Sequence, residues 1–193
     1  MFSSKRLQFR KMVENDIEKY HSWRNDVDVM NTTSLSLDLY SLDETRHFVE
    51  NIILNSTSSK SYIIEERESN TAIGVMSLIN IDTKNRNAEC IIDIGEKEYW
   101  GKGYGTEALK TLLEYAFLEL NLHRVSIRVF SLNEKAIRIY DKLGFVKEGV
   151  MRESLYRNGK WHDIIIMGVL KREYLTLNYR GVDRKRVKAI LLE

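Results

Sequence analysis

Residues 99–108 read Tyr-Trp-Gly-Lys-Gly-Tyr-Gly-Thr-Glu-Ala, with three glycines at alternate positions between two segments of opposite character. The preceding residues 88–94 (Ala-Glu-Cys-Ile-Ile-Asp-Ile) form a mostly apolar, β-branched run that predicts a buried strand. From residue 108 to residue 120, apolar side chains recur at helical spacing. In a strand, glycine turn and helix of this order, backbone N–H groups and the helix N-terminus can converge on a phosphate. The stretch therefore predicts an anion-binding turn.

The spacing of these glycines excludes two common nucleotide-binding turns. A Walker A loop ends in glycine, lysine and then serine or threonine, whereas Tyr104 and Gly105 follow Gly103 here. A dinucleotide-binding fingerprint needs Gly-x-Gly-x-x-Gly early in a strand–helix–strand unit, with an acidic residue about twenty positions later. The glycines here run Gly-x-Gly-x-Gly in mid-chain, and Glu119, the acid near that distance, lies within the expected helix. The turn is therefore expected to hold a pyrophosphate in another way.

A second informative segment, residues 133–145, reads Asn-Glu-Lys-Ala-Ile-Arg-Ile-Tyr-Asp-Lys-Leu-Gly-Phe. It follows residues 124–130, in which apolar and polar side chains alternate as in a strand. Asn133 is a favourable helix N-cap, and Gly144 suits the position just after a helix of about ten residues. The spacing predicts one helix face that carries Asn133, Ala136, Tyr140 and Leu143.

Together, the two segments resemble the GNAT superfamily of acetyl-CoA-dependent N-acetyltransferases. That family carries (Gln/Arg)-x-x-Gly-x-(Gly/Ala) at a helix start and Asn-x-x-Ala-x-x-x-Tyr-x-x-x-Gly-Phe in the following strand–helix unit. Trp100 stands where the family usually has Gln or Arg, which removes a side-chain donor but leaves the backbone turn, so cofactor binding should survive. The resemblance extends over roughly residues 5–175, and its matches are Gly103, Gly105, Asn133, Ala136, Tyr140, Gly144 and Phe145.

The composition of the 193 residues, of which 43% are hydrophobic, indicates one globular domain with a full core. We expect this domain over residues 1–177, followed by a basic tail over residues 178–193. The single cysteine, Cys90, excludes an internal disulfide and suits a reduced, buried thiol. The net charge of +2 argues against a nucleic-acid surface. No apolar run approaches the length of a membrane span, and residues 1–10 do not resemble a signal peptide, so a cytoplasmic location is expected.

Hydrophobic periodicity and turn residues predict a mixed α/β fold in the order β-α-α-β-β-β-α-β-α-β-β. Asn158-Gly159 is a strong signal for a hairpin between the last two strands. The resemblance implies a GNAT-like central, mostly antiparallel sheet, flanked by helices and splayed between the fourth and fifth strands. The expected strands are residues 7–9, 62–66, 72–80, 88–94, 124–130, 146–156 and 161–170, and the expected helices begin near residues 15, 42, 106 and 134.

Acetyl transfer from a thioester to an amine requires a neutral nucleophile and a proton for the departing thiolate. The resemblance implies that Tyr140 is the general acid, and a phenol with a pKa of about 10 suits donation to a thiolate; a core aromatic beside the cofactor is the alternative. Glu89 is the first candidate for the base because it lies on the strand expected beside the thioester, although it could also be a solvated strand-edge acid. Asp93 is a weaker candidate, being nearer the pyrophosphate turn, and His123 and His162 are weaker still.

The same resemblance implies acetyl-CoA as co-substrate. Backbone amides of residues 101–106 should hold the pyrophosphate, and backbone groups of residues 92–94 should pair with the pantetheine arm like an added strand. Asn133 is expected to bond that arm, to cap its helix, or both, while the lysines nearby either reach phosphates or are solvated. One cysteine and four scattered histidines offer no metal-binding spacing. The expected cofactor-binding residues are Ile92, Asp93, Ile94, Trp100, Gly101, Lys102, Gly103, Tyr104, Gly105, Thr106, Asn133, Lys135 and Lys142.

The acceptor amine is less well defined. Asn-Leu-His-Arg at residues 121–124 and Glu-Gly-Val-Met-Arg-Glu at residues 148–153 resemble the branch of ribosomal-protein N-terminal and spermidine acetyltransferases. The expected partner is a protein or peptide N-terminus or a small amine such as a polyamine, with no nucleic acid or membrane, and a homodimer is left open. A non-catalytic CoA-binding regulatory or assembly module is the alternative of another class. Acids that could attract a cationic amine, or could simply be solvated, are Glu14, Asp16, Glu18, Asp26, Asp28, Asp38, Asp43 and Glu44.

Overall fold

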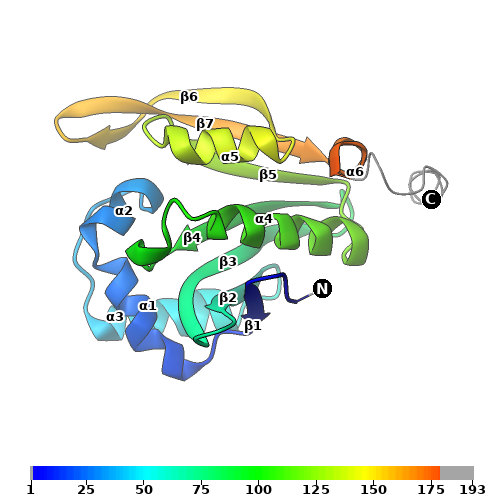
Figure 1. Ribbon diagram of the computed structural model, residues 1–193. Helices are drawn as coiled ribbons and strands as arrows, with labels where there is room; N and C mark the ends of the chain where they lie inside the picture. Colours follow the sequence, from blue (N-terminus) through cyan, green and yellow to red (C-terminus); the bar gives the residue numbers. More distant parts are fainter. Residues whose placement is uncertain (1, 179–193) are drawn as a thin grey trace.

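The computed structural model describes residues 2–178, which form a seven-stranded sheet with helices packed on it (Figure 1). The strand order is β1-β2-β3-β4-β5-β7-β6, and every neighbouring pair is antiparallel except β4 and β5, which run parallel. This arrangement confirms the predicted mixed, mostly antiparallel sheet. The strands are β1 (Leu7–Arg10), β2 (Lys60–Glu66), β3 (Thr71–Asp82), β4 (Asn87–Ile94), β5 (Arg124–Phe130), β6 (Val146–Arg157) and β7 (Lys160–Leu170).

Helices connect the strands and cover the sheet. Two of them continue as π-helical segments, Val49–Leu54 after α3 and Tyr115–Glu119 after α4. Within residues 2–178, no helix combines the length and apolar character needed to cross a membrane. The helices are α1 (Ile17–Arg24), α2 (Val27–Thr33), α3 (Leu42–Phe48), α4 (Tyr104–Glu114), α5 (Glu134–Lys142) and α6 (Lys171–Asn178), with short 3-10 turns at Glu14–Asp16 and Lys97–Tyr99.

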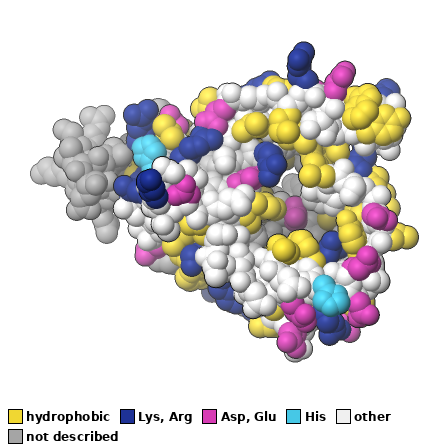
Figure 2. All heavy atoms as spheres, turned by 180° about the vertical axis from the view of Figure 1, so that it is seen from behind, with side chains coloured by type: hydrophobic (Ala, Val, Ile, Leu, Met, Phe, Trp, Pro, Cys, Tyr) yellow, Lys and Arg dark blue, Asp and Glu magenta, His cyan; other side chains and the backbone are white. Residues whose placement is uncertain are grey.

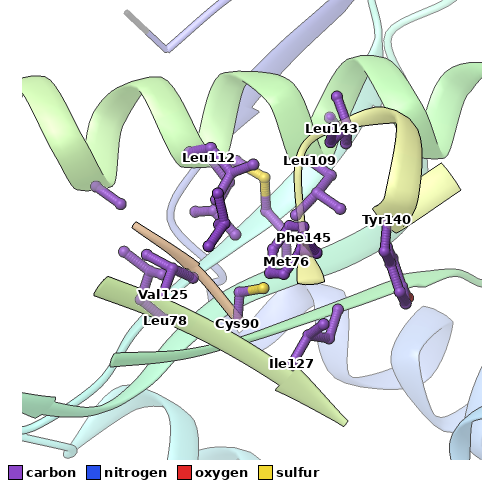
Figure 3. Packing of buried hydrophobic residues seen from close by; sticks show 14 of the residues in the cluster. Met76, Leu78, Cys90, Leu109, Leu112, Val125, Ile127, Tyr140, Leu143 and Phe145 are labelled. Atoms are coloured by element: carbon purple, nitrogen blue, oxygen red, sulfur yellow. The ribbon is translucent and has the colours of Figure 1, made fainter. Parts of the chain in front are cut away.

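Strand alternation sorts the buried side chains into two layers, one on each face of the sheet. On one face, α4, α5 and α6 pack against the larger layer, part of which is seen in Figure 3. On the other face, α1 and α3 pack against a smaller layer. Burying each large aliphatic side chain contributes about 1.5–3 kcal/mol. The larger layer includes Ile64, Met76, Leu78, Cys90, Leu109, Leu112, Val125, Tyr140 and Tyr174, and the smaller includes Ile17, Trp23, Val49, Ile63 and Val75.

The parallel strands β4 and β5 separate along their length. Only residues 87–89 of β4 pair with residues 124–126 of β5. Beyond this point, β4 continues to Ile94 beside β3, while β5 continues to Phe130 beside β7. The facing edges of their C-terminal halves therefore carry backbone polar groups that do not bond to each other. This confirms the predicted splay between the fourth and fifth strands.

The structure contains two helices that the sequence prediction lacks, α2 and α6. Residues 27–33 are rich in β-branched and polar residues with low helix propensity, so their pattern is weak. Helix α2 forms because the Asp26 carboxylate caps the N–H groups of Asp28 and Val29, and because Val29 and Met30 are buried. Helix α6 follows β7 directly and ends at Asn178, the first residue of the predicted basic tail. The rest of that tail lies outside the described residues.

Candidate active site

The glycine turn that follows β4 places backbone N–H groups at the N-terminus of α4. Gly101 and Gly103 have φ angles of 73° and 83°, a left-handed conformation that costs other residues about 1–2 kcal/mol. Gly103 is the N-cap of α4, so the first N–H groups of the helix are free to bind an anion. A Cβ atom added at Gly101 would meet nothing within 4 Å, so the space over the turn is open. The turn fits a pyrophosphate, while the individual contacts of residues 101–106 stay predictions.

An ion pair with the segment just before β1 holds this turn in place. Glu107, in the first turn of α4, accepts hydrogen bonds from the Ser4 hydroxyl at 2.7 Å and the Arg6 backbone N–H at 2.8 Å, and it pairs with the Arg6 guanidinium at 2.7 Å. The same guanidinium donates to the Lys102 carbonyl at 3.0 Å. Burial alone would raise the pKa of Glu107, but these bonds outweigh it and lower the pKa. Sequence analysis missed this anchor because its partners are about a hundred residues apart.

Trp100, the departure from the family pattern, serves the same end of β4. Its indole N–H donates to the Ile94 carbonyl at 2.7 Å, and the ring is partly exposed at the surface. Ile94 is the last residue of β4, so the tryptophan ties the exit of the strand to the turn that follows. Trp100 therefore supports the turn from the side of the strand, and any direct contact with the cofactor stays a prediction.

Tyr140 lies on α5, with its ring reaching from that helix toward the strands (Figure 3). The side chain is buried, and the rings of Tyr140 and Phe145 are 5.8 Å apart between centroids. Burial, together with the nearby Cys90 thiol and Asp93 carboxylate, raises the pKa of Tyr140. The phenol therefore keeps its proton at neutral pH, as a proton donor must. Asn133 caps α5 by accepting the Ala136 N–H at 3.2 Å, which confirms the predicted cap.

Glu89, the predicted base, lies on β4 opposite Ser126, at the last pair of the parallel ladder. Its two carboxylate oxygens accept hydrogen bonds from the Arg128 guanidinium at 2.7 and 3.1 Å. This interaction raises the pKa of Arg128. Each oxygen of Glu89 therefore bonds the same guanidinium, which balances the charge of the carboxylate. Its role as base stays a prediction, and Arg128 is a partner that the alternation along residues 124–130 could have indicated.

Asp93 lies four residues further along β4, in the splayed half of the strand and opposite Val75 of β3. The residue is half-buried, with part of its surface open to solvent. Its carboxylate has no hydrogen bond or ion pair within residues 2–178. The surrounding protein atoms desolvate the carboxylate and raise its pKa to about 6. A perturbed, unpaired acid at a strand opening is a feature typical of functional sites.

The lysines predicted to meet the cofactor are at the surface. Lys135 and Lys142 are exposed on α5, and Lys102 is exposed on the glycine turn. Their ammonium groups pair with no carboxylate in the described part of the chain, so their predicted contacts with phosphates stay untested. Across residues 2–178, no three His, Cys, Asp or Glu side chains are placed to hold a metal ion.

Sequence comparison matches residues 6–146 to the acetyltransferase (GNAT) domain family. The matched region contains both motifs, the splayed strands and the glycine turn. The chain belongs to the GNAT acetyltransferase family. It is therefore an N-acetyltransferase that uses acetyl-CoA as acetyl donor, as the two motifs predict.

Two relatives show where this GNAT enzyme lies within the family. It is 30% identical to the spermidine N(1)-acetyltransferase of Vibrio cholerae over 169 residues, which cover 88% of this chain and 95% of that enzyme. It is 45% identical to the putative ribosomal N-acetyltransferase YdaF of Bacillus subtilis over 101 residues, 52% of this chain and 55% of that protein. The crystal structure of the Vibrio cholerae spermidine N-acetyltransferase with CoA and spermine matches with a TM-score of 0.81 at 28% identity, covering 89% of this chain and 99% of that chain. Both relatives fall in the predicted branch.

Beyond the splayed strands, a second region of this GNAT domain is the candidate acceptor side. Figure 2 shows a hollow between the part formed by the β6–β7 hairpin and the part formed by α1–α3. The two parts are joined where Arg157, at the end of β6, donates to the Ser34 carbonyl at 2.6 Å. Lys97, just after β4, pairs with Asp26 and Asp28 at the start of α2, at 2.9 and 2.8 Å. These contacts place α2 and the loop after it beside the open end of β4.

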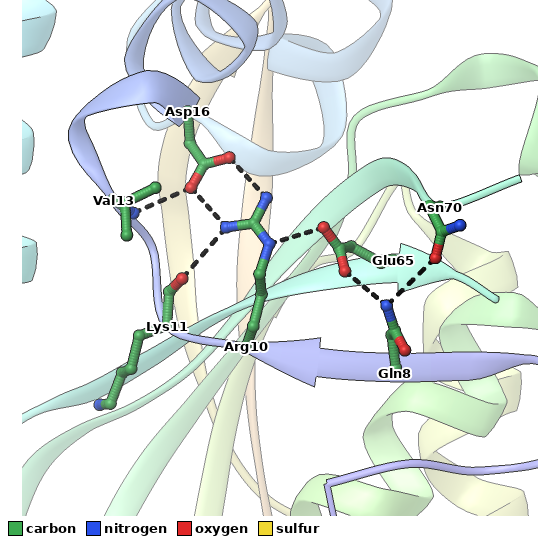
Figure 4. Close-up of polar contacts among 7 residues, drawn as sticks. All are labelled: Gln8, Arg10, Lys11, Val13, Asp16, Glu65 and Asn70. Carbon is green, nitrogen blue, oxygen red and sulfur yellow. Dashed lines mark hydrogen bonds and ion pairs between the residues drawn. The ribbon is translucent and has the colours of Figure 1, made fainter.

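Ion pairs and caps engage much of the acid-rich N-terminal region. Arg10 bonds both Asp16 and Glu65, and Asp16 also accepts the Val13 N–H (Figure 4). Glu44 closes a capping box with Ser41 at the start of α3. Asp26 and Asp28 are paired with Lys97. Together with Asp16 and Glu44, they are four of the eight acids singled out in the sequence, and all four have structural partners. The expectation that the region attracts a cationic amine gains no support from these four.

Proposed function

We propose that this enzyme acetylates the amino group at the N-terminus of a peptide or protein. The observation that carries the proposal is a rim of exposed apolar side chains at the acceptor side. They belong to the loop after α2 and to the tip of the β6–β7 hairpin, where the rings of Tyr156 and Trp161 are 5.0 Å apart. Their exposed fractions range from 42% to 75%. The apolar rim consists of Leu35, Leu37, Leu39, Tyr156 and Trp161.

Exposed apolar and aromatic side chains of this kind are typical of surfaces that bind other proteins. A free polyamine carries several ammonium groups and needs several carboxylates along its length. Asp26 and Asp28, the acids at the start of α2, are occupied by Lys97, and Asp38 accepts the N–H of the neighbouring Leu39. The charges beside the rim therefore favour one ammonium group followed by apolar side chains.

A polyamine acceptor is the second candidate. It rests on the relative named spermidine N(1)-acetyltransferase, which this chain matches over nearly its whole length, and on the match to that enzyme's structure with CoA and spermine. The homodimer that the sequence left open and the cytoplasmic location expected from it remain predictions beside either acceptor.

In the proposed reaction, acetyl-CoA supplies the acetyl group as a thioester. The free N–H groups of the glycine turn and of the α4 N-terminus bind its pyrophosphate, and the unpaired edge of β4 binds the pantetheine arm. The neutral amine forms a bond to the thioester carbonyl carbon, and the carbon–sulfur bond then breaks. Tyr140 donates its phenolic proton to the departing sulfur and regains a proton from the new amide nitrogen or from solvent.

The test is a rate comparison between acceptors. Release of CoA thiol is followed with short peptides that have free N-termini and apolar second and third residues, and with spermidine and spermine. We expect kcat/KM for the best peptide to exceed that for either polyamine by at least about tenfold, a difference of about 1.4 kcal/mol. A higher kcat/KM with a polyamine would replace the peptide proposal with the second candidate.

Surface variants show whether the apolar rim carries that preference. Leu39→Ser and Trp161→Ser should raise KM for the peptide several-fold and leave kcat for a small amine unchanged, because each removes apolar contact area from the rim. Leu118→Ser is the matched control, since Leu118 is also exposed but lies in the π-helical segment after α4. An equal effect of all three variants on the peptide would contradict a role for the rim.

A further inference from the structure

The splayed half of β4 presents side chains to two different compartments of the enzyme. Cys90 is buried in the layer beneath α4 and α5, and Ile92 and Ile94 pack against the same layer. Because successive strand residues point to opposite faces, Glu89 and Asp93 belong to the face that α1 and α3 cover. That face also holds Val75, the cross-strand partner of Asp93. Asp93 therefore lies on the acceptor side of the sheet, beyond the point where β4 and β5 part.

We propose that Asp93 binds the ammonium group of the acceptor and takes the proton that this group must lose before attack. The inference rests on the proposed acetyl transfer to a primary amine and assigns the proton acceptor for it. The acceptor nitrogen then lies between two groups on opposite sides of the splay, the Asp93 carboxylate and the Tyr140 phenol. The two are close enough for the Asp93 charge to raise the pKa of Tyr140.

No lysine, arginine or histidine forms an ion pair with Asp93 within residues 2–178, although Arg24 on α1 is close enough to Tyr20 to lower the pKa of that phenol. The pKa of Tyr20, on α1, is raised first by burial and second by the nearby negative charge of Asp93. A neutral phenol of this kind cannot neutralise the charge of a carboxylate. Several charged groups on the elements around β4 are engaged elsewhere within residues 2–178, although the buried Nη1 of Arg24 makes no hydrogen bond. Arg24 on α1 stacks on Tyr40 and Phe48, Asp28 on α2 pairs with Lys97, Glu107 on α4 pairs with Arg6, and Arg128 on β5 pairs with Glu89.

A partly buried carboxylate without a cation is costly to a fold, so its retention needs a reason. A substrate ammonium group would provide the missing charge. The contrast with Glu89 is direct, because Glu89 already has a bidentate guanidinium partner that balances its charge, whereas Asp93 has none. A base with a pKa of about 6 is also ionised at neutral pH and can pass its proton on to solvent.

The proton balance of the reaction is simple. The acceptor enters as R–NH3⁺ and loses one proton to the Asp93 carboxylate, which returns it to solvent. The neutral amine attacks, the nitrogen–carbon bond forms, and the carbon–sulfur bond breaks. Tyr140 gives its proton to the thiolate, and the nitrogen then loses a second proton, which restores the Tyr140 phenol. The products are the amide, CoA thiol and one proton released to solvent. No further reactant is required.

The test compares Asp93→Asn with Glu89→Gln, using the peptide or polyamine that gives the highest wild-type rate. For Asp93→Asn we expect kcat/KM at pH 7 to fall by about 10²- to 10³-fold and its rise near pH 6 to disappear. Glu89→Gln should keep that rise. Both variants should bind acetyl-CoA as the wild type does, measured as the increase in Tm on adding acetyl-CoA. A wild-type pH profile in Asp93→Asn, or loss of the rise in Glu89→Gln alone, would overturn the proposal.

Thermal unfolding without substrate gives an independent readout. The pKa of Asp93 is raised in the folded state, so its contribution to stability is full below about pH 4 and is lost as the pH rises through about 6. Asp93→Asn should therefore have a higher Tm than the wild type at pH 8 and the same Tm at pH 4. Equal Tm values at pH 8 would show that the carboxylate has a partner and would overturn the proposal. If no amine is acetylated, the transfer proposal fails, while this comparison still decides whether Asp93 is unpaired.

Discussion

The two sides of the splayed sheet are held together in different ways. The cofactor side presents backbone groups from one continuous stretch, β4 through the glycine turn into α4, and Arg6 is the distant side chain that anchors it. The acceptor side depends on side chains that distant segments bring together, such as Arg157 with Ser34 and Lys97 with Asp28. A backbone site keeps its geometry when surface side chains change, whereas a side-chain site changes with each substitution. The difference explains how one cofactor site can serve enzymes with different acceptors.

Tyr140 belongs to the boundary between the two sides, and its substitution gives the largest expected effect. Tyr140→Phe should lower kcat by about 10²- to 10³-fold, because the departing thiolate would lose the proton donor proposed for it. The acetyl-CoA-induced rise in Tm should remain, since the turn and β4 are untouched. Tyr115→Phe, in the π-helical segment after α4, is the control and should keep full activity. If Tyr140→Phe kept its rate but lost acetyl-CoA protection, Tyr140 would be a packing residue of the cofactor side.

The ion pairs of the N-terminal region make a second, stability-based contrast. Asp16→Asn should lower the free energy of unfolding by about 2 kcal/mol at pH 7, because it removes charge-assisted hydrogen bonds between the buried Asp16 carboxylate and the partly exposed Arg10 guanidinium. Burial alone would raise the pKa of Asp16, but hydrogen bonds from Arg10 and Val13 outweigh it and lower the pKa. The wild type should therefore lose this stability as the pH falls below about 4, and the variant should not.

Urea unfolding at pH 7 and pH 3 measures this contribution of Asp16. Asp43→Asn is the matched control, because Asp43 is exposed in the first turn of α3 and should change stability by well under about 1 kcal/mol. Equal destabilisation by the two variants would mean that the Arg10 network adds nothing beyond an ordinary surface charge.

The same contrast governs what the sequence could reveal. The cofactor side was predictable because its signals are local: the Gly-x-Gly-x-Gly turn, the Asn133 cap and the alternation of β5 each lie within about a dozen residues. The splay was predictable only through resemblance, because strand pairing is a long-range property. On the acceptor side, helix α2 has weak propensity and forms through its cap and the burial of Met30.

The sequence also could not show which charged residues form ion pairs with each other. An isolated run of acids looks alike whether its members are solvated or bonded to arginine and lysine from elsewhere in the chain. The structure separates Asp26 and Asp28, which have Lys97, from Asp93, which has no cation within the described residues. The ranking of Glu89 above Asp93 depended on position along one strand alone, and it could not include Arg128 from the next strand.

Gly103→Ala tests whether the cofactor side really depends on its backbone. Alanine at a φ of 83° should lower stability by about 1 kcal/mol and weaken acetyl-CoA binding several-fold, because the turn must shift to relieve the strain. The acceptor KM should not change. Gly105→Ala is the matched control, since Gly105 lies within α4 and its added Cβ would make an ordinary contact with Ile94 at 3.6 Å. A larger loss of acetyl-CoA affinity in Gly105→Ala would place the critical backbone two residues further into the helix.

Trp100→Phe should have the smallest effect, and it separates support of the turn from contact with the cofactor. The substitution removes one hydrogen bond, to the Ile94 carbonyl, at a partly exposed position, so we expect a loss of stability of about 0.5–1 kcal/mol. The KM for acetyl-CoA should change by less than about threefold, a difference below about 0.7 kcal/mol. Trp100→Arg restores a residue that the family pattern allows and adds a positive charge beside the glycine turn. If only the arginine variant improved acetyl-CoA binding, the turn would have room for a charged side chain that contacts the cofactor. Trp100 would then replace that contact with its hydrogen bond to the Ile94 carbonyl.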